Sequence, residues 1–447
     1  MKRKSLEFLT NVAIQSIKFY LKRACVMKAE KKRPMLIEVD FQLRLVFLLF
    51  AVVSMVCTVT NFIPFSAITI LLFPFLPLWL TANRNMHPII FSCLLLFSYF
   101  LFSTLLYAPS SLLSFDFYRR DGNVFISYLP ILLYGPIALY LNLQQFISLF
   151  LYWTALIVLL CISVFSILDL VVHDGSCHHF LFHAHNAAGG FLASAAALSL
   201  GFCIHRRKIR YKGVFCVLFI GLVLTNSRGS LLGFCLAYVS VLLCKNKLNK
   251  YFVVLAVIAS SLFMAYAYPL WLEMGKPVDM RSFQKEDLLQ GVERAHTIYD
   301  RMFILWPRSL YLWLQSPILG TGFGSYNDLP YHLEGLPYLY VVNRPVKLFF
   351  SSAHAHHSYL HILGETGLFG LSLFIYFLNA VRKFLEKIDI PSLRDGMLLV
   401  FWTLIWSSFT EHRLTTPSQV LPFTILLGLF LANSHKLCVN KNLGLTS

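Results

Sequence analysis

The sequence predicts an all-α integral membrane protein with about twelve transmembrane helices and one large helical loop between spans 9 and 10. Three observations predict this class: the composition, the apolar runs, and the distribution of Lys and Arg. Hydrophobic residues make up 57% and aromatic residues 15% of the 447 positions, against 13% charged residues. Soluble globular domains are less apolar than this, so a water-soluble fold is excluded.

Twelve apolar runs have about the length that a helix needs to cross a bilayer, roughly 20 residues. They lie at about 43–60, 62–82, 88–108, 123–141, 145–168, 187–204, 213–226, 229–244, 250–270, 358–380, 396–410 and 417–433. The chain therefore divides into a basic N-terminal segment (1–41), spans 1–9 (42–270), a helical cap loop (271–357), spans 10–12 (358–433) and a tail (434–447).

Lys and Arg provide an independent test of this topology, because they accumulate in cytoplasmic loops. With a cytoplasmic N-terminus, 26 of the 38 basic residues fall in cytoplasmic segments, and eight of the others share the long loop 271–357. Both termini are therefore expected in the cytoplasm. The net charge of +17 is explained by membrane topology and anionic lipid headgroups and not by nucleic acid, since the basic residues flank apolar spans in short loops.

The N-terminal segment 1–41 is expected to lie on the inner leaflet as an amphipathic helix, with disorder as the alternative. No cleavable signal is expected, because Lys18, Lys22 and Arg23 interrupt its apolar stretches. Of the ten cysteines, all but Cys177 fall in apolar spans, near their ends or in cytoplasmic segments. No disulfide framework is therefore predicted.

The polar residues gather on the outward side, which holds twelve of the 15 histidines. The loop 271–357 is too long for a simple connector, and apolar residues recur at helical spacing from 288 to 315. Pro307 interrupts this pattern, and three glycines within 320–324 permit a tight turn. We expect a small helical cap on the outer membrane face.

Five arginines lie near apolar spans on the outward side: Arg119, Arg120, Arg228, Arg301 and Arg413. Arginine at such a position is costly unless it is paired or solvated. One interpretation is anion binding, because a guanidinium group matches phosphate oxygens in bidentate geometry. The other is snorkelling, or pairing with one of the acidic residues Asp116, Asp121, Asp300 and Glu411. For Arg228, which lies in a very short hairpin between two spans, anion binding is the favoured interpretation.

Four histidines lie where the long loop meets span 10: His354, His356, His357 and His361. Three roles are open to them: metal ligation together with the histidines of 178–186, a structural role, or general-base catalysis. General-base catalysis is favoured, because a neutral imidazole can accept a hydroxyl proton near pH 7. The N-terminus of the following helix also disfavours protonation of a nearby histidine.

Three glycines follow the histidines at intervals of three residues: Gly364, Gly367 and Gly370. They share one helix face and would let another span approach closely. Glu365 lies between them, and a carboxylate within a span is rare and usually paired. Glu365 is expected either to orient a histidine or to face a polar cavity.

These segments resemble the O-antigen ligase-like superfamily, which includes lipid A-core ligases, O-antigen polymerases and bacterial O-oligosaccharyltransferases. His356, Gly367 and Gly370 fit the histidine-glycine spacing of the family, while His357 stands where a small polar residue is usual. NSRG (226–229) and the pair of Arg301 with SPILGTGFGSY (316–326) are similar to two further family elements. HAHNAAGG (183–190) is a looser match, so the resemblance runs from about 183 to 380.

The resemblance implies a glycosyltransferase C-like membrane enzyme without metal or other cofactor. It would transfer a glycan from undecaprenyl diphosphate to an acceptor hydroxyl at the periplasmic face of the bacterial inner membrane, with inversion. His356 would be the base, and Arg228 with Arg301 would bind the diphosphate. The other candidate substrate-binding residues are Arg119, Arg120, His185, Asn186, His354, His357, Glu365 and Arg413.

Lipid A-core is the preferred acceptor, which makes the protein an O-antigen ligase. A second carrier-linked repeat, as in a polymerase, or a protein hydroxyl, as in an oligosaccharyltransferase, are the alternatives within the family. The aromatic side chains of the cap, Trp306, Tyr311 and Trp313, offer faces for sugar stacking. The alternative outside the family is a polysaccharide transporter or flippase, although the sequence shows neither repeated halves nor ionisable residues near the midplane.

Overall fold

The computed structural model describes residues 88–113, 123–133, 143–172, 185–206, 208–245, 301, 305–328, 354–414 and 417–433. Every regular element in these ranges is a helix. They are α5 (Pro88–Tyr107), η2 (Pro109–Leu113), α7 (Asn123–Leu133), α9 (Leu143–Val172), α10 (His185–Arg206), α11 (Ile209–Leu224), α12 (Arg228–Lys245), α16 (Trp306–Gln315), α17 (Ser325–Asp328), α19 (Ser358–Glu386), α20 (Pro391–Ser407) and α21 (Pro417–Ala432).

Four of the described helices are long and apolar enough to cross a membrane: α5, α9, α10 and α19. Arg228–Leu243 and Val420–Leu431 are shorter apolar helices. These helices confirm an all-α multi-pass membrane protein. The total of twelve spans stays a prediction, because the runs at 43–60, 62–82 and 250–270 lie outside the described residues, as do the ends 1–41 and 434–447.

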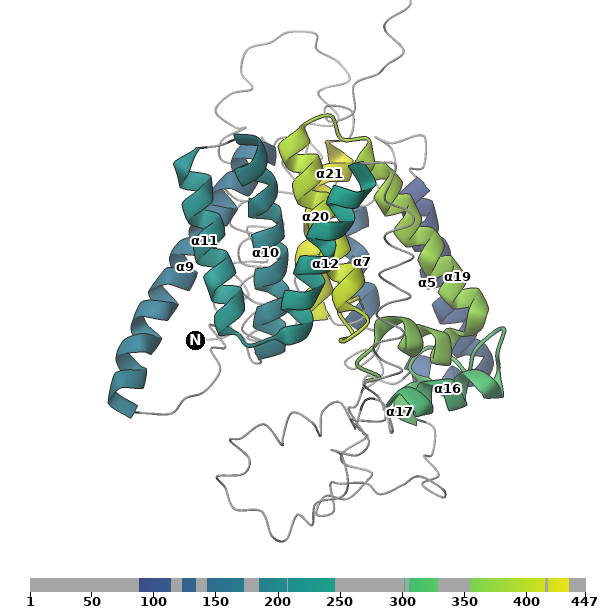
Figure 1. Ribbon diagram of the computed structural model, residues 1–447. Helices are drawn as coiled ribbons and strands as arrows, with labels where there is room; N and C mark the ends of the chain where they lie inside the picture. Colours follow the sequence, from purple (N-terminus) through teal and green to yellow (C-terminus); the bar gives the residue numbers. More distant parts are fainter. Residues whose placement is uncertain are drawn as a thin grey trace, which may run out of the picture.

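Small residues let three helices pack closely in the middle of the bundle, where α10, α12 and α20 lie side by side (Figure 1). The backbone of Gly396 in α20 lies against Gly201 of α10, so close that a Cβ at Gly201 would overlap it. On the other side of α20, Ser407 leaves room only for a glycine at position 233 of α12. Small residues at such contacts bring helix backbones together, which is how spans associate in lipid.

The helices α10, α12 and α19 begin at one end of this bundle, and α20 ends there. We call this the site end. The cap also lies at this end: α16 and α17 lie across it in Figure 1, beside the start of α19. The connection between α20 and α21, of which 408–414 are described, completes the site end.

The cap is attached to α19 where that helix is broken at Gly367, whose φ of 64° and ψ of −170° are not helical. The break leaves the amides of Leu368 and Phe369 without helical acceptors. The turn after α16 supplies the carbonyl groups of Pro317 and Ile318, at 2.9 and 3.0 Å. Hydrogen bonds to the cap thus replace the helical ones at the break, as a buried backbone requires.

The three glycines of α19 were expected to pack against another span, but most of their contacts are with the cap. A Cβ at Gly364 would meet the backbone of Ser309 in α16, and one at Gly367 would meet the turn after α16. Of the three, Gly370 is the one that faces a side chain of a span, Tyr99 of α5. The close backbone packing predicted from the glycines is therefore present, but two of the three glycines pack against the cap and one against a span.

Replacing Gly367 by alanine should lower the free energy of unfolding by about 2–4 kcal/mol, because its φ is positive and a Cβ would overlap the carbonyl oxygen of Ile318. Gly213→Ala is the matched control. Gly213 lies in α11, and a Cβ added there would have no neighbouring atom within 4 Å, so alanine should be neutral or slightly stabilising. Thermal unfolding in detergent measures both variants, and equal melting temperatures would contradict this account of the break.

Candidate active site

A single buried carboxylate organises the site end. Glu411, in the connection after α20, is 4% exposed. Its Oε1 accepts a hydrogen bond from Nη2 of Arg301 at 2.8 Å, and its Oε2 lies 2.9 Å from Nδ1 of His356. Arg301 also donates from Nη1 to the carbonyl oxygen of Thr410 at 2.9 Å. Glu411 therefore joins an arginine and a histidine that both stand among the predicted catalytic residues.

The first residue of α19 fixes the backbone that carries Glu411. The amide of Ser358 donates to the carbonyl oxygen of Ser408 at 2.9 Å. The Ser358 hydroxyl donates to the carbonyl oxygen of Glu411 at 3.4 Å and accepts from the amide of Leu414 at 3.2 Å. Because Ser358 is buried, these bonds hold the connection firmly beside the start of α19.

The charge of Glu411 is well stabilised. Burial by itself would raise the pKa of this carboxyl, but the hydrogen bond from His356 and the charges of Arg413 and Arg301 outweigh it and lower the pKa to about 2. Glu411 is therefore an anion at any physiological pH. An anionic carboxylate can only accept, so Nδ1 of His356 must donate.

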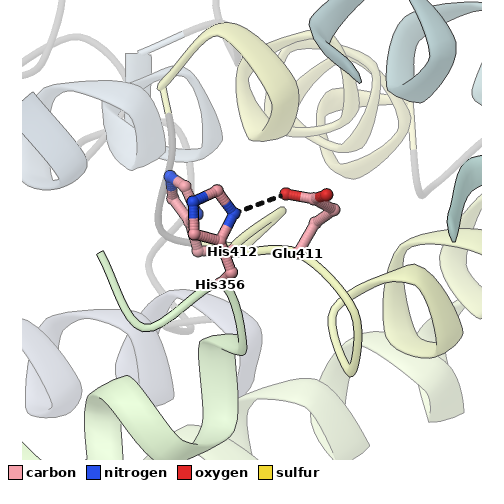
Figure 2. A group of neighbouring side chains, drawn as sticks. All are labelled: His356, Glu411 and His412. Carbon is pink, nitrogen blue, oxygen red and sulfur yellow. Dashed lines mark hydrogen bonds and ion pairs between the residues drawn. The ribbon is translucent and has the colours of Figure 1, made fainter. Parts of the chain in front are cut away.

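This bond sets the tautomer of His356. With the proton on Nδ1, the lone pair of the neutral imidazole is on Nε2, which can accept a proton from a substrate. The His356 side chain is 34% exposed, so it is accessible from the site end. Its backbone has a φ of 47°, in the left-handed region that His adopts more readily than most residues. Figure 2 shows the imidazole directed at Glu411, with His412 beside it.

Arg301 keeps donors for a ligand. A guanidinium group has five N–H bonds, and the two bonds to Thr410 and Glu411 use two of them. The pairing of an arginine with Glu411, one of the two interpretations of the sequence, is thus present. It does not prevent anion binding by the remaining N–H groups.

Arg413 is buried inside the fold, with 0% exposure. Its Nη1 donates to the carbonyl oxygen of Asn186 at 2.6 Å, and its Nη2 donates to the hydroxyl of Ser230 at 2.6 Å. Burial is the main cause that lowers its pKa, to about 10, so it stays protonated at neutral pH. Arg413 therefore joins the N-termini of α10 and α12 to the connection that carries Glu411.

Asn186 takes part in the same network. Its side-chain oxygen accepts from the hydroxyl of Ser227 at 3.1 Å, and the hydroxyls of Ser227 and Ser230 are 2.7 Å apart. Gly189 permits this approach, because a Cβ there would overlap Ser227. Hydrogen bonds to Asn186 of α10 and to Arg413 therefore fix the position of the NSRG segment (226–229) and the start of α12.

Arg228 follows directly after this anchored segment, at the start of α12. Its side chain is exposed, and no hydrogen bond or ion pair joins it to the residues that the structure describes. The next residue, Gly229, lies against the Thr410 side chain, next to Glu411. Arg228 thus stands at the same end of the bundle as Arg301 and His356, with its guanidinium group available.

His357 has a different environment from His356. Its Nδ1 accepts the amide of Leu360 at 3.1 Å and so caps α19. Burial lowers its pKa to about 4, with only a partial opposing effect of a backbone hydrogen bond. The ring lies edge-on to Trp306 and Phe409, at 5.5 and 5.4 Å between centroids. His357 is therefore well placed to support the fold, and His356 to act as a base.

His354, one of the predicted histidines, stacks beside His356 together with His412, which the sequence analysis did not single out. The rings of His354 and His412 are 4.2 Å apart between centroids, and His412 is 5.1 Å from His356. Burial, then the neighbouring histidines and Arg413, lower the pKa of His412 well below its usual value. His412 is thus neutral near pH 7. His185 is the first residue of α10, partly buried at the site end.

Glu365 lies under the cap. It is fully buried, and its Oε1 accepts the amide of Tyr326 at 3.1 Å and lies 3.6 Å from Nε2 of His361. The sequence suggested that Glu365 orients a histidine or faces a polar cavity. The structure shows a contact with a histidine, His361. Arg119 and Arg120 lie outside the described residues.

A metal ion is the other ligand that this cluster could hold. His356, Glu411 and His412 offer ligand atoms that lie within 4.8 Å of one another. Both oxygens of Glu411 are already bonded, to Arg301 and His356, and Arg413 adds a second positive charge nearby. The described arrangement therefore suits an anionic ligand better than a cation.

Residues 213–375 match the family model described as O-Antigen ligase. No curated protein matches the chain. The matched range includes Arg228, Arg301 and His356, whereas Glu411 and Arg413 lie after its end. The match bears out the resemblance inferred from the sequence motifs. Residues 213–375 are therefore similar to the O-antigen ligase family.

Proposed function

We propose that this protein is an inverting membrane glycosyltransferase that moves a glycan from undecaprenyl diphosphate to an acceptor hydroxyl, and that its preferred acceptor is lipid A-core. The observation that carries the proposal is the position of Glu411, which bonds both His356 and Arg301. One carboxylate thus places a base beside a phosphate-binding cation. The reaction would take place at the periplasmic face of the bacterial inner membrane, with both termini in the cytoplasm.

The reaction follows from the chemistry of these side chains. Arg228 and Arg301 hold the donor diphosphate through charge-assisted hydrogen bonds. Nε2 of His356 takes the proton of the acceptor hydroxyl as its oxygen attacks C1 of the sugar. The bond between C1 and the phosphate oxygen breaks on the opposite side, and its electron pair leaves on the diphosphate. Glu411 stabilises the imidazolium that forms, and no metal is required in this scheme.

The acceptor is tested by deleting the gene and examining the surface polysaccharide. Loss of a ligase should leave bare lipid A-core together with carrier-bound polymer. Loss of a polymerase should instead leave core bearing a single repeat, and loss of a protein glycosyltransferase should leave lipopolysaccharide unchanged. Transfer of a carrier-linked glycan by the purified protein in detergent, without any gradient, would exclude a transporter.

Replacing Arg228 by alanine should reduce kcat/KM for the donor by roughly 10- to 150-fold, since it removes about 1.5–3 kcal/mol of charged hydrogen bonding. The melting temperature should not change, because Arg228 is exposed and bonds no described residue. Arg301→Ala is the comparison. It should reduce transfer and also lower the melting temperature, since it breaks the pair with buried Glu411. An unchanged kcat/KM for the donor in Arg228→Ala would remove this residue from the site.

A further inference from the structure

The exposed face of α16, which points away from the rest of the protein, is more apolar than that of a helix in water. Leu310, Tyr311 and Leu314 are 40%, 48% and 67% exposed, while Ser309 and Leu312 on the opposite side are buried. With 3.6 residues per turn, the exposed residues share one arc of the helix, together with Gln315. Water-facing helices place polar residues on the exposed side, so this arc faces something other than bulk water.

The turn that follows α16 extends this face to the flank of α19. Ile318 is 67% and Leu319 is 39% exposed. The carbonyl oxygens of Pro317 and Ile318 accept the amides of Leu368 and Phe369, whose side chains are each 48% exposed. The apolar surface of the turn is therefore continuous with that of α19.

The same turn reaches α5 on its other side. The hydroxyl groups of Tyr107 and Ser316 are 3.3 Å apart, and Leu105 and Leu106 beside Tyr107 are 56% and 50% exposed. Exposed apolar residues continue along α5 at helical spacing to Phe91. Since α5 is one of the helices able to cross the membrane, this row is its lipid-facing side. The face of α16 is thus continuous with the lipid-facing sides of two spans.

The level of α16 follows from the break in α19. The 14 residues from 368 to 381, between Gly367 and the charged end of α19, rise about 21 Å, whereas the hydrocarbon core is about 30 Å thick. Gly367 therefore lies within about 10 Å of the edge of the core, which is the depth of an interfacial helix, and the turn after α16 is bonded to the two residues that follow it. In Figure 1, α16 lies below α5 and α19, at the lower right.

We propose that α16 and the turn 316–319 form an interfacial anchor, with Leu310, Leu314 and Ile318 inserted among the acyl chains of the leaflet at the site end. The partner is the lipid surface itself. An apolar arc that carries a tyrosine, and that has no charged residue in it, fits the boundary between headgroups and acyl chains.

The anchor has a consequence for Arg301, which precedes Trp306 at the start of α16 by five residues. A helix fixed in the interface holds this arginine near the headgroups, where a lipid-borne diphosphate would lie. This last step rests on the proposed function. The position of α16 in the interface does not, since it depends only on the packing against α5 and α19.

The anchor is tested by placing a genetically encoded fluorescent amino acid at position 314 and reconstituting the full chain in phospholipid vesicles. Quenching by lipids that carry a nitroxide near the headgroup reports contact with the interface, and quenching by iodide reports contact with water. Phe102, exposed in the apolar row of α5 and five residues before its end at Tyr107, is the lipid control. Lys208, exposed between α10 and α11, is the water control. A label at Ile318 gives a second reading if the first variant does not fold.

The label at 314 should be quenched by the nitroxide lipids and resist iodide much as the label at 102 does. Strong iodide quenching, as at 208, would overturn the proposal. Weak quenching by both reagents would overturn it as well, because another part of the protein would then cover the face. The measurement does not use activity, so an inactive enzyme with a buried label would refute the proposed function and leave the anchor intact.

Discussion

Replacement of His356 by alanine should lower glycan transfer by about 10²- to 10⁴-fold, the range that a general base contributes. The protein should still fold, because the side chain is 34% exposed and its one described hydrogen bond goes to Glu411. The measurement is turnover of a carrier-linked glycan by the purified variant, with the melting temperature as a check of folding.

His357→Asn is the matched control for this variant. Asparagine can still accept the amide of Leu360 and cap α19, so the fold should be kept while the imidazole is lost. We expect transfer within several-fold of the natural protein. If His357→Asn were inactive and His356→Ala active, the base would be His357 and the roles derived from the hydrogen bonds would be wrong.

Replacement of Glu411 by glutamine should also lower transfer by about 10²-fold or more, although it changes no atom's position by much. Arg301 can only donate, so the amide oxygen must face Arg301 and the amide NH₂ must face Nδ1 of His356. The imidazole would then carry its proton on Nε2, where the acceptor hydroxyl needs a lone pair. A wrong tautomer of this kind costs about 10⁴ in serine proteases.

Glu365→Gln is the control, since Glu365 is a second buried carboxylate that bonds the cap and not His356. It should affect the melting temperature more than turnover in the folded protein. Activity of Glu411→Gln equal to that of Glu365→Gln would show that the tautomer of His356 does not depend on residue 411.

The stability of the protein should fall in acid because of Glu411. Its pKa is about 2 in the folded protein against 4.5 for an ordinary glutamate, so the carboxylate is stabilised by folding. The contribution, on the order of 3 kcal/mol, is fully present above about pH 4.5 and is lost as the pH falls toward 2. Melting temperatures in detergent between pH 6 and pH 3 should fall less steeply for Glu411→Gln than for the natural protein.

The helical membrane class could be predicted from the sequence because it depends on local properties. The apolar runs at 88–108 and 187–204 coincide closely with α5 and α10, since a span needs only length and hydropathy. The run at 145–168 was also identified, but α9 extends from Leu143 to Val172, past Gln144 at one end and Asp169 at the other, because a single polar residue ends an apolar run without ending a helix.

Part of the candidate site was predictable for the same reason. His356, Arg228 and Arg301 stand out because charged and titratable residues are rare beside apolar spans, and the family match covers all three. Arg413 and Asn186 were singled out as well, but no pattern revealed that they bond each other inside the fold. Their roles toward a substrate stay predictions.

Glu411 shows what the sequence could not provide. It was one of four acidic residues available to pair with an arginine, and 55 positions separate it from His356. Nothing local distinguishes it, because its importance comes from the contact between the start of α19 and the connection after α20. The break at Gly367 is similar: the spacing of the glycines predicted close packing, but the partner was the cap and not mainly another span.

The sequence by itself determined that this is a helical membrane protein, and it determined which side chains are able to bind an anion or accept a proton. Each of these properties depends on residue type and short-range spacing. The tertiary structure decided which of these side chains meet. Only the folded chain brings a buried carboxylate between Arg301 and His356, and a bond of 2.9 Å to Nδ1 leaves the other ring nitrogen as the acceptor. The proton position of a histidine depends on its bonded neighbour, and that neighbour is set by packing between distant segments.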